Sequence, residues 1–331
     1  MLKKYLFAIV YSMLLTAFTV YVLMDTFVIT RVYSTVPAVE AGPEAGSAVA
    51  DSDSAVAEAA STAEQAASLA EEAASAPAQS SGSPANQSPV STATSYQDEN
   101  ITITLTQYRE YDTSIYVADI TLSSPEYLQT ALAQNAYGRN VTEKTSEMAV
   151  ENGAILAING DYYGAQESGY VLRNGVLYRD IAERGQEDLV IYEDGSFEII
   201  TEDEVTAQEL LDRGAVQILS FGPALVTGGD VSVTAGEEVG KARSSNPRTA
   251  IGVIDDLHYV FVVSDGRTDE SEGLSLYQLA EFISELGAET AYNLDGGGSS
   301  SMVFNGNVIN NPTTSGNRIK ERSVSDIVYI G

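Results

Sequence analysis

The chain has 331 residues, of which 44% are apolar, so it can build one sizeable folded domain and further segments. It contains no Cys, which excludes disulfide frameworks, Cys nucleophiles and Cys-based zinc sites. The single His, His258, lies in a strand-like run, which disfavours a Ser-His-Asp triad. Asp and Glu number 47 against 17 Lys and Arg, a formal net charge of −30. Nucleic acids and anionic lipids need a basic surface, so we expect no nucleic-acid partner.

The N-terminal segment has the pattern of a membrane anchor. Lys3 and Lys4 precede an uncharged run over residues 5–24, long enough at about 1.5 Å per residue to cross a hydrocarbon layer of about 30 Å. Residues 1–33 are therefore predicted to form a transmembrane anchor. A cleaved secretory signal is the alternative, but its apolar region spans about 7–15 residues and small side chains follow it, whereas residues 25–33 are bulky.

The charges beside this run predict its orientation. Two lysines stand before it and only Arg31 follows it, so the N-terminus should lie in the cytoplasm and the remainder outside. The absence of Cys fits a bacterial protein outside the cytoplasm that does without disulfides. We therefore expect a single-pass protein of the cell membrane whose folded domain is extracytoplasmic.

Residues 34–95 are dominated by Ala, Ser, Glu and Pro and contain no Lys or Arg. With almost no large apolar side chains this segment cannot build a core, so it is predicted to be a disordered linker. The folded domain is then expected over residues 96–331. This part keeps 38 acidic and 14 basic residues, a net charge of about −24.

Within the domain, alternating apolar and polar residues predict half-buried strands over 101–108 and 115–122. Two-residue turns at Asn174-Gly175 and Asp194-Gly195 predict two hairpins. Further along, the pattern predicts helices over 143–152, 206–213 and 275–286, and strands over 154–158, 216–219, 249–254, 259–263, 291–294, 302–304 and 325–330. The mixture predicts an α+β fold, a single domain with a mixed β-sheet and few helices.

The most informative segment for function is 293–302. In it Asp295 ends a short apolar run and is followed by three Gly and three Ser residues. Glycine lets the backbone approach a ligand closely, so this loop suggests a polar ligand held against exposed amides. Asn159 and Asp265 also lie just past strand-like runs and beside Gly, so we expect all three to meet in one cleft. The alternative is that each side chain caps its own turn.

Two arginines are candidates for binding a phosphate group. Arg248 opens a predicted strand and Arg267 follows Asp265-Gly266, and arginine suits bidentate contact with phosphate. A structural ion pair with a neighbouring acid is the alternative for either. Tyr162, Tyr163 and Tyr170 can supply a stacking wall for a sugar ring, although aromatic clusters also build cores.

Four motifs occur in order over roughly residues 130–331: Ala-Ile-Asn-Gly-Asp-Tyr-Tyr at 157–163, Pro-Arg-Thr-Ala-Ile-Gly at 247–252, Ser-Asp-Gly-Arg at 264–267, and Leu-Asp-Gly-Gly-Gly-Ser-Ser at 294–300. Together they resemble the phosphodiester glycosidases related to the lysosomal uncovering enzyme, N-acetylglucosamine-1-phosphodiester α-N-acetylglucosaminidase, and their bacterial exopolysaccharide-associated relatives. One departure is Asp161, which stands where many relatives have a small residue before the aromatic pair.

The resemblance implies an enzyme of the glycoside hydrolase type. Its substrate would be a sugar-1-phosphodiester in cell-surface or exopolysaccharide metabolism, with N-acetylglucosamine as a candidate sugar. Phosphate is a weakly basic leaving group, so a strong general acid is not needed. Asp295 is then the expected base or nucleophile, and Asp265 the second catalytic acid. The implied substrate-binding residues are Asn159, Asp161, Arg248, Arg267, Gly297, Gly298 and Ser299.

Two alternatives remain at this point. A non-catalytic glycan-binding or polysaccharide-assembly protein could keep the same fold, although the complete set of polar site residues favours an enzyme. No cofactor is expected. A divalent cation held by the acids of the Asp295 loop would recast the site as metal-assisted hydrolysis, but no spacing here resembles a known cation loop.

Overall fold

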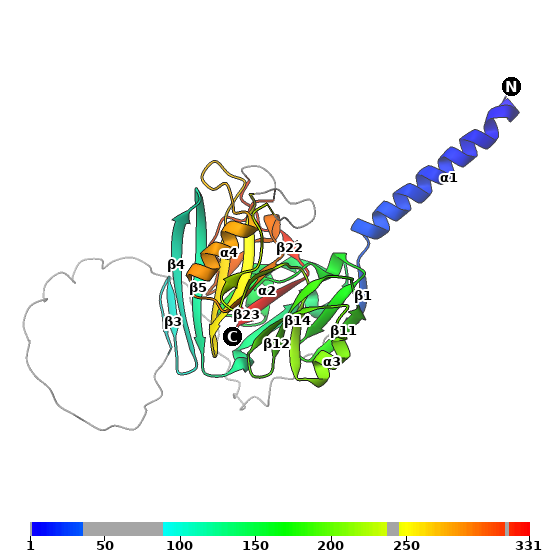
Figure 1. Cartoon of the computed structure of the whole chain (residues 1–331). Coiled ribbons are helices and arrows are strands. Elements are labelled where there is room, and N and C mark those ends of the chain that lie inside the picture. Colours follow the sequence, from blue (N-terminus) through cyan, green and yellow to red (C-terminus); the bar gives the residue numbers. More distant parts are fainter. Residues whose placement is uncertain (1, 36–88, 237–244, 315–317) are drawn as a thin grey trace, which may run out of the picture. The chain divides into compact units, whose positions relative to one another are not determined.

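The computed structural model describes residues 2–35, 89–236, 245–314 and 318–331. Its N-terminal helix α1 covers Leu2–Phe27 and is followed by β1, Arg31–Thr35 (Figure 1). Over the described residues, no helix has both the length and the apolar character that crossing a membrane requires. The predicted transmembrane anchor is therefore not supported. Its last residues, 31–33, belong instead to β1, which pairs antiparallel with β7, Ala136–Arg139.

Most of the predicted linker, residues 34–95, lies outside the described residues. At its C-terminal end the chain is already part of a sheet, because β2 (Val90–Ser91) pairs with β3 (Ser95–Gln97).

Three sheets make up most of the described structure. The largest has nine strands in the order β16 (Asp230–Val231), β15 (Ala224–Thr227), β19 (Thr290–Leu294), β17 (Arg248–Asp255), β18 (His258–Ser264), β5 (Thr113–Leu122), β4 (Ile101–Glu110), β3 and β2. A five-stranded sheet has the order β11 (Val176–Ile181), β10 (Gly169–Arg173), β14 (Ala215–Leu219), β12 (Glu187–Tyr192) and β13 (Phe197–Thr201). The other five-stranded sheet has the order β21 (Asn307–Val308), β20 (Met302–Phe304), β9 (Leu156–Asn159), β23 (Asp326–Ile330) and β6 (Leu128–Leu132).

All described strand pairs are antiparallel, including the short pair of β22 (Ser323–Val324) with β8 (Glu143–Lys144). The predicted mixed sheet is therefore wrong. Parallel neighbours need long crossover connections, whereas here hairpins such as β4–β5 and β17–β18 join adjacent strands directly. The prediction of a single domain with few helices is confirmed, and the α+β prediction is corrected to a domain that is mostly β.

Helices cover the outer faces of these sheets. The α-helices after α1 are α2 (Thr145–Glu151), α3 (Ala207–Asp212) and α4 (Leu276–Glu285), and short 3-10 turns cover Pro125–Tyr127, Ala133–Asn135, Tyr163–Ala165 and Gly297–Ser299. The Ser275 hydroxyl caps α4 by accepting a hydrogen bond from the Gln278 main-chain N–H. The apolar face of α4, including Leu279 and Ile283, packs on the nine-stranded sheet.

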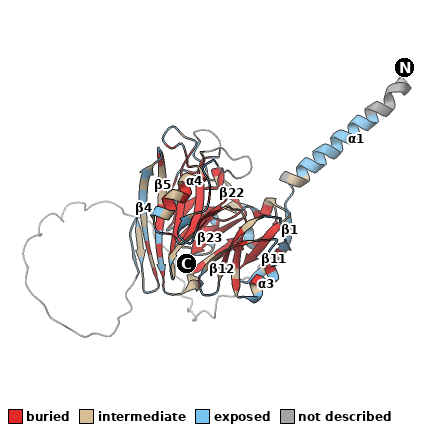
Figure 2. Ribbon diagram, viewed as in Figure 1, coloured by how far each residue is buried: buried red, intermediate tan, exposed pale blue. Residues whose placement is uncertain are grey.

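The main core fills the space between the opposite face of the nine-stranded sheet and both five-stranded sheets. Phe261 from β18 and Leu294 from β19 pack in one cluster with Ile158, Val328 and Leu219 from the smaller sheets. Figure 2 shows buried residues concentrated along these strands. Strand β18 is buried along almost its whole length because both of its faces are covered, which explains its continuous apolar run.

The predicted helices and most predicted strands form close to their expected positions. The sequence did not indicate β6, β7 and β15, nor β1, β3 and the two-residue strands β2, β8, β16 and β22. Strand β15 is short and buried, and it carries an apolar run without the alternation that marks a half-buried strand.

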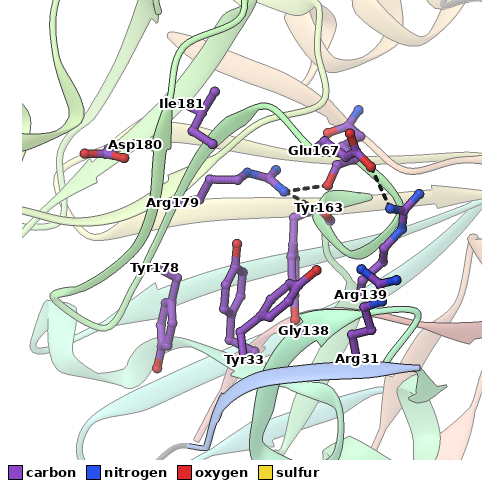
Figure 3. Close-up of a pocket in the computed structure, with 12 residues that line it drawn as sticks. Arg31, Tyr33, Gly138, Arg139, Tyr163, Glu167, Tyr178, Arg179, Asp180 and Ile181 are labelled. Atoms are coloured by element: carbon purple, nitrogen blue, oxygen red, sulfur yellow. Dashed lines mark hydrogen bonds and ion pairs between the residues drawn. The ribbon is translucent and has the colours of Figure 1, made fainter. Parts of the chain in front are cut away.

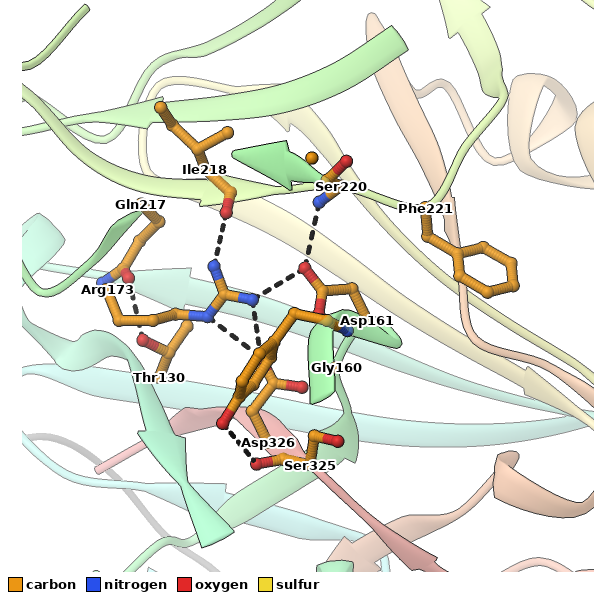
Figure 4. Close-up of polar contacts among 12 residues, drawn as sticks. Thr130, Gly160, Asp161, Arg173, Gln217, Ile218, Ser220, Phe221, Ser325 and Asp326 are labelled. Atoms are coloured by element: carbon orange, nitrogen blue, oxygen red, sulfur yellow. Dashed lines mark hydrogen bonds and ion pairs between the residues drawn. The ribbon is translucent and has the colours of Figure 1, made fainter. Parts of the chain in front are cut away.

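A buried ion cluster lies at the centre of the smaller sheets. Arg173 at the end of β10 donates to Asp161 Oδ2 at 2.7 Å and, through Nε and Nη2, to Asp326 Oδ2 at 2.9 and 2.7 Å (Figure 4). Both carboxylates have no exposed side-chain surface. Two acids thus share one cation away from water, so burial and the neighbouring Asp161 raise the pKa of Asp326 to about 8.

This cluster predicts a pH-dependent stability. The pKa of Asp326 is higher in the folded state than its ordinary value of 3.8, so folding takes up a proton and stability should fall as pH rises from about 4 to 8. Asp326→Asn should reduce this slope by up to about 1.4 kcal/mol per pH unit. Denaturant unfolding of the full chain from pH 5 to 8 measures it.

Asp256→Asn is the matched control because Asp256 is exposed. Burial also raises the pKa of Asp188 well above its ordinary value, so the wild-type slope contains its contribution and only the difference between variants reports on Asp326. Equal slopes for the Asp326 variant and the wild type would contradict the prediction.

Candidate active site

Four predicted site residues lie at one edge of the nine-stranded sheet and its junction with β9. Arg248 begins β17 and pairs in register with Ser264, the last residue of β18, so Asp265 follows beside it. Thr249 pairs with Leu294, the last residue of β19, so Asp295 emerges next to Arg248. The antiparallel register therefore brings three motifs that are distant in sequence to a single rim.

Asn159, the last residue of β9, connects this rim to the neighbouring sheet. Its Nδ2 donates to the main-chain carbonyls of Asp295 and Gly160 at 2.7 and 3.2 Å. Its Oδ1 accepts from the Thr249 hydroxyl at 2.9 Å and the Ser301 main-chain N–H at 3.2 Å. The amide is fully buried and its hydrogen-bonding capacity is used inside the protein. Asn159 thus positions the Asp295 loop, and this geometry does not favour the predicted substrate contact.

Asp295 lies at the centre of the rim, with a side chain that is 12% exposed. Its Oδ2 accepts from the Ser299 hydroxyl at 2.5 Å and from Arg322 Nη2 at 3.0 Å, and Arg322 also donates to the Ser299 hydroxyl. Among the described residues, no group donates to Oδ1. Burial raises the pKa of Asp295, while Arg322 and Ser299 oppose the rise. The result is a carboxylate with one constrained oxygen and increased basicity.

The glycines after Asp295 let three loops converge. The Gly297 main-chain N–H donates to the Pro247 carbonyl at 2.8 Å. At Gly297, where φ is +62°, an added Cβ would lie 2.8 Å from Arg267 Nη2. At Gly298 a Cβ would meet Thr314 Oγ1, also at 2.8 Å. Side chains here would therefore separate the loop from its neighbours, and Gly297, Gly298 and Ser299 are all buried in this junction.

Asp265 is held by neutral donors. Its Oδ1 accepts from the Asn311 main-chain N–H at 2.7 Å, and its Oδ2 accepts from the Asn311 amide and the Tyr116 hydroxyl at 3.0 and 3.2 Å. Burial, followed by the charge of this carboxylate, raises the pKa of Tyr116 to about 12. Asn310 Nδ2 donates to Asp265 Oδ1 at 3.4 Å and to the Ser300 carbonyl at 3.0 Å. Asp265 therefore belongs to the same site as the Gly-rich loop. Its role as second catalytic acid stays a prediction.

The arginines of the site differ in exposure. Arg248 is buried and donates through Nε to the Leu274 carbonyl at 2.9 Å. Arg267 is exposed and contacts Asn246 Oδ1 through Nη2 at 2.8 Å. Sequence reasoning did not identify Arg322, whose side chain is 40% exposed and contacts Asp295 directly. Its only sequence signal was a basic residue shortly before the last strand.

The remaining candidates lie away from the rim. Asp161 is fully engaged in the buried Arg173 cluster and also accepts the main-chain N–H groups of Tyr163 and Ser220, so it has no surface for substrate. Tyr163 and Tyr170 are 1% and 2% exposed and belong to the core, whereas Tyr162 is 43% exposed. Tyr163 and Tyr170 therefore agree with the alternative of a core cluster, and Tyr162 is the member of the three that is exposed. Among the described residues, no three His, Asp or Glu side chains are grouped closely enough to hold a metal ion.

Comparison with known proteins agrees with this geometry. The sequence model of one family, described as phosphodiester glycosidase, matches residues 152–331, more than half of the chain. The chain belongs to the phosphodiester glycosidase family. The matched range holds Asn159, Arg248, Asp265, Asp295 and Arg322.

Curated relatives and a solved structure extend the comparison. The chain is 28% identical over 184 residues to mouse N-acetylglucosamine-1-phosphodiester alpha-N-acetylglucosaminidase, covering 50% of this chain and 35% of that protein. It is 30% identical over 180 residues to the SPbeta prophage-derived uncharacterized protein YomE of Bacillus subtilis, covering 53% of this chain and 28% of that one. It thus spans about a third of the length of these relatives.

The catalytic domain of zebrafish N-acetylglucosamine-1-phosphodiester alpha-N-acetylglucosaminidase has a similar fold. The TM-score is 0.55 at 21% identity, with 70% of this chain and 82% of that chain covered. At this identity the similarity shows the phosphodiester glycosidase fold. The reaction must be argued from the side chains of the site.

The contact between Arg322 and Asp295 makes a testable prediction. Arg322→Gln removes the cation that lowers the pKa of the Asp295 carboxyl, so this pKa should rise further. A shift of about one unit or more is expected for a buried carboxyl that loses an adjacent positive charge. Carbon-detected NMR titration of the full chain measures it.

Arg318→Gln, an exposed arginine on the same segment, is the control and should leave the pKa of Asp295 unchanged. An unchanged pKa in the Arg322 variant, or an equal rise in both variants, would show that Arg322 does not stabilise the ionised carboxylate.

Proposed function

We propose that this protein hydrolyses the glycosidic bond of a sugar-1-phosphodiester. The observation that carries the proposal is the Asp295 cluster, in which a buried carboxylate of raised pKa lies beside Ser299 and Arg322. Membership in the phosphodiester glycosidase family supports the reaction class. The named activity of the mouse and zebrafish relatives suggests N-acetylglucosamine as the sugar.

Asp295 is the proposed base or nucleophile. A carboxylate whose pKa is raised is a better proton acceptor than a solvent-exposed one, and it is used in its ionised form. Activity should therefore fall as pH falls through the raised pKa of this group. Ser299 and Arg322 hold Oδ2, which leaves Oδ1 as the oxygen directed to the anomeric carbon or to an attacking water.

The arginines are proposed to receive the phosphate. Arg267 and Arg322 are the more accessible cations of the rim, and guanidinium groups contact phosphate oxygens bidentately. Buried Arg248 lies beneath the Gly-rich loop, where an added Cβ at Gly296 would meet the Pro247 carbonyl oxygen at 2.9 Å and Arg248 Cα and Cδ at 3.9 Å. Because phosphate departs as a weak base, this arrangement does not depend on a general acid of high pKa.

Hydrolysis of a substrate panel tests the proposal. The full chain is incubated with UDP-sugars and sugar-1-phosphodiesters, α-N-acetylglucosaminyl compounds included, with and without EDTA, and free sugar is measured. Asp295→Asn should lower the rate by about 10²–10⁴-fold because a positioned base is lost. The control Asp256→Asn should keep the wild-type rate.

Full activity of Asp295→Asn would contradict the proposed role of this residue. Loss of activity in EDTA, restored by a divalent cation, would assign the site to metal-assisted hydrolysis. Binding of sugar phosphates by the wild type without any turnover would favour the alternative, a non-catalytic glycan-binding or polysaccharide-assembly protein.

We further propose that the domain acts outside the cytoplasm on cell-surface glycans or exopolysaccharide. The support is the absence of Cys, which fits a protein outside the cytoplasm that does without disulfides. Protease added to intact cells should digest the domain as completely as it does in lysed cells. Full protection in intact cells would contradict this location.

A further inference from the structure

A polar cavity lies beside β1 and does not include the residues of the Asp295 rim. Its volume is about 350 Å³, within the range of about 300–1,000 Å³ typical of small-molecule sites. Its walls come from β1, β7, β11 and the turn that begins at Tyr163 (Figure 3). Tyr163 was one of the tyrosines considered for a sugar-stacking wall, whereas none of the residues assigned to the Asp295 rim lines this cavity. It is therefore a separate feature of the fold.

Arg179 gives this cavity its strongest chemical signal. Only 8% of the residue is exposed, and main-chain carbonyls fix its guanidinium, with Nε donating to Gly169 at 2.6 Å and Nη1 to Tyr163 and Gln166 at 3.0 and 2.8 Å. Nη2 is buried and has no hydrogen-bond partner among the described residues. A buried cationic donor without an acceptor is unfavourable, so this atom calls for an oxygen ligand.

Other cations on the wall point to a negatively charged ligand. Arg139 donates through Nη1 to Glu167 at 2.6 Å, while its buried Nε also lacks a partner among the described residues. Arg31 pairs with Asp25. Glu167 and Asp180 are the acids that line the cavity, and the Glu167 side chain is 78% exposed. Arg31 and Arg139 are thus paired with acids, and Arg179 is the cavity arginine that has no carboxylate partner among the described residues.

Tyrosine rings form the remaining wall. Tyr137 stacks on Tyr163 at 5.5 Å with an interplanar angle of 20°, and it contacts Tyr33 and Tyr178 at 5.8 and 5.0 Å. Tyr33 is 59% exposed, so much of its ring is open to a ligand. Burial raises the pKa of Tyr137 and the Arg179 cation opposes this rise, so the hydroxyl lies near the guanidinium. Flat apolar faces next to polar groups suit a sugar ring that carries an acidic substituent.

We propose that this cavity binds an acidic sugar, a pyranose carrying a carboxylate or a phosphate. The oxyanion accepts from Arg179 Nη2 and Arg139 Nε, and the ring lies against Tyr33. The site would let the protein hold an acidic glycan at a place distinct from the Asp295 rim. The proposal does not depend on the hydrolytic activity.

Equilibrium binding to the full chain tests this site. Isothermal titration uses glucuronic acid and glucose 6-phosphate as the two acidic sugars, with glucose and inorganic phosphate as the neutral and sugar-free probes. At least one acidic sugar should bind at least tenfold more tightly than glucose and inorganic phosphate. Which acidic sugar binds distinguishes a carboxylate ligand from a phosphate ligand.

Variants assign the binding to the cavity. Arg179→Lys and Tyr33→Ala should each weaken it at least tenfold, whereas Arg184→Lys, a conservative change of an exposed arginine near the same strand, should not. Tyr33 lies on an exposed strand, so its variant remains informative if Arg179→Lys unfolds. Arg267→Ala, at the Asp295 rim, should leave the affinity unchanged.

Three results would overturn the proposal. They are no binding of either acidic sugar, equal binding of inorganic phosphate that is insensitive to Tyr33→Ala, and loss of binding in Arg267→Ala in place of the cavity variants. The last result would place the ligand at the Asp295 rim. Hydrolysis by the wild type is measured separately, so failure of this site and failure of the proposed reaction are distinguishable.

Discussion

The candidate site depends on how the Asn159 amide joins two sheets. It donates to the main chain of Asp295 and Gly160 and accepts from Thr249 and Ser301, so β9, β17 and both ends of the Gly-rich loop meet at one side chain. A shorter or apolar residue would leave these buried groups without partners, at a cost of about 1–3 kcal/mol for each unsatisfied group. Asn159 thus fixes the position of the main chain that carries the Asp295 carboxylate.

Two residues after Asn159, the same segment supplies Asp161 to a buried ion cluster. The charge of Asp161 contributes to the raised pKa of both Asp326 and Asp295. A side chain with no exposed surface can therefore act on the proposed base through electrostatics alone, because charges interact strongly where water is excluded. Asn159 therefore positions the Asp295 loop and Asp161 raises the pKa of Asp295, although the two residues are only two positions apart.

The convergence of Asp295 and Asp265 was easier to predict from the sequence than the arrangement of the sheets. Asp295 and Asp265 could be identified because each follows an apolar strand and stands beside Gly, and antiparallel pairing then brings them together. Arg322 could not be identified in this way, because a loop brings it close to Asp295 and no local sequence pattern predicts the course of that loop. Asp161 was predicted to bind substrate, but it forms a buried ion pair with Arg173, which is 12 residues away in the sequence. The sequence alone does not show that both side chains are buried. The antiparallel sheets were missed because short strands give the same local pattern in either orientation.

Arg179 and Arg322 show how the setting of an arginine determines its use. Arg179 donates through Nε and Nη1 to main-chain carbonyls, and these hydrogen bonds fix the position of its third nitrogen, Nη2. In the proposed cavity site, Nη2 is the atom that binds the ligand. Arg322 is held by the Asp295 carboxylate and Ser299, both of which belong to the proposed site. In the proposed reaction a phosphate that attracts Arg322 would weaken its hold on Asp295. The pKa of Asp295 would then rise further, so substrate binding itself would make the carboxylate a stronger base.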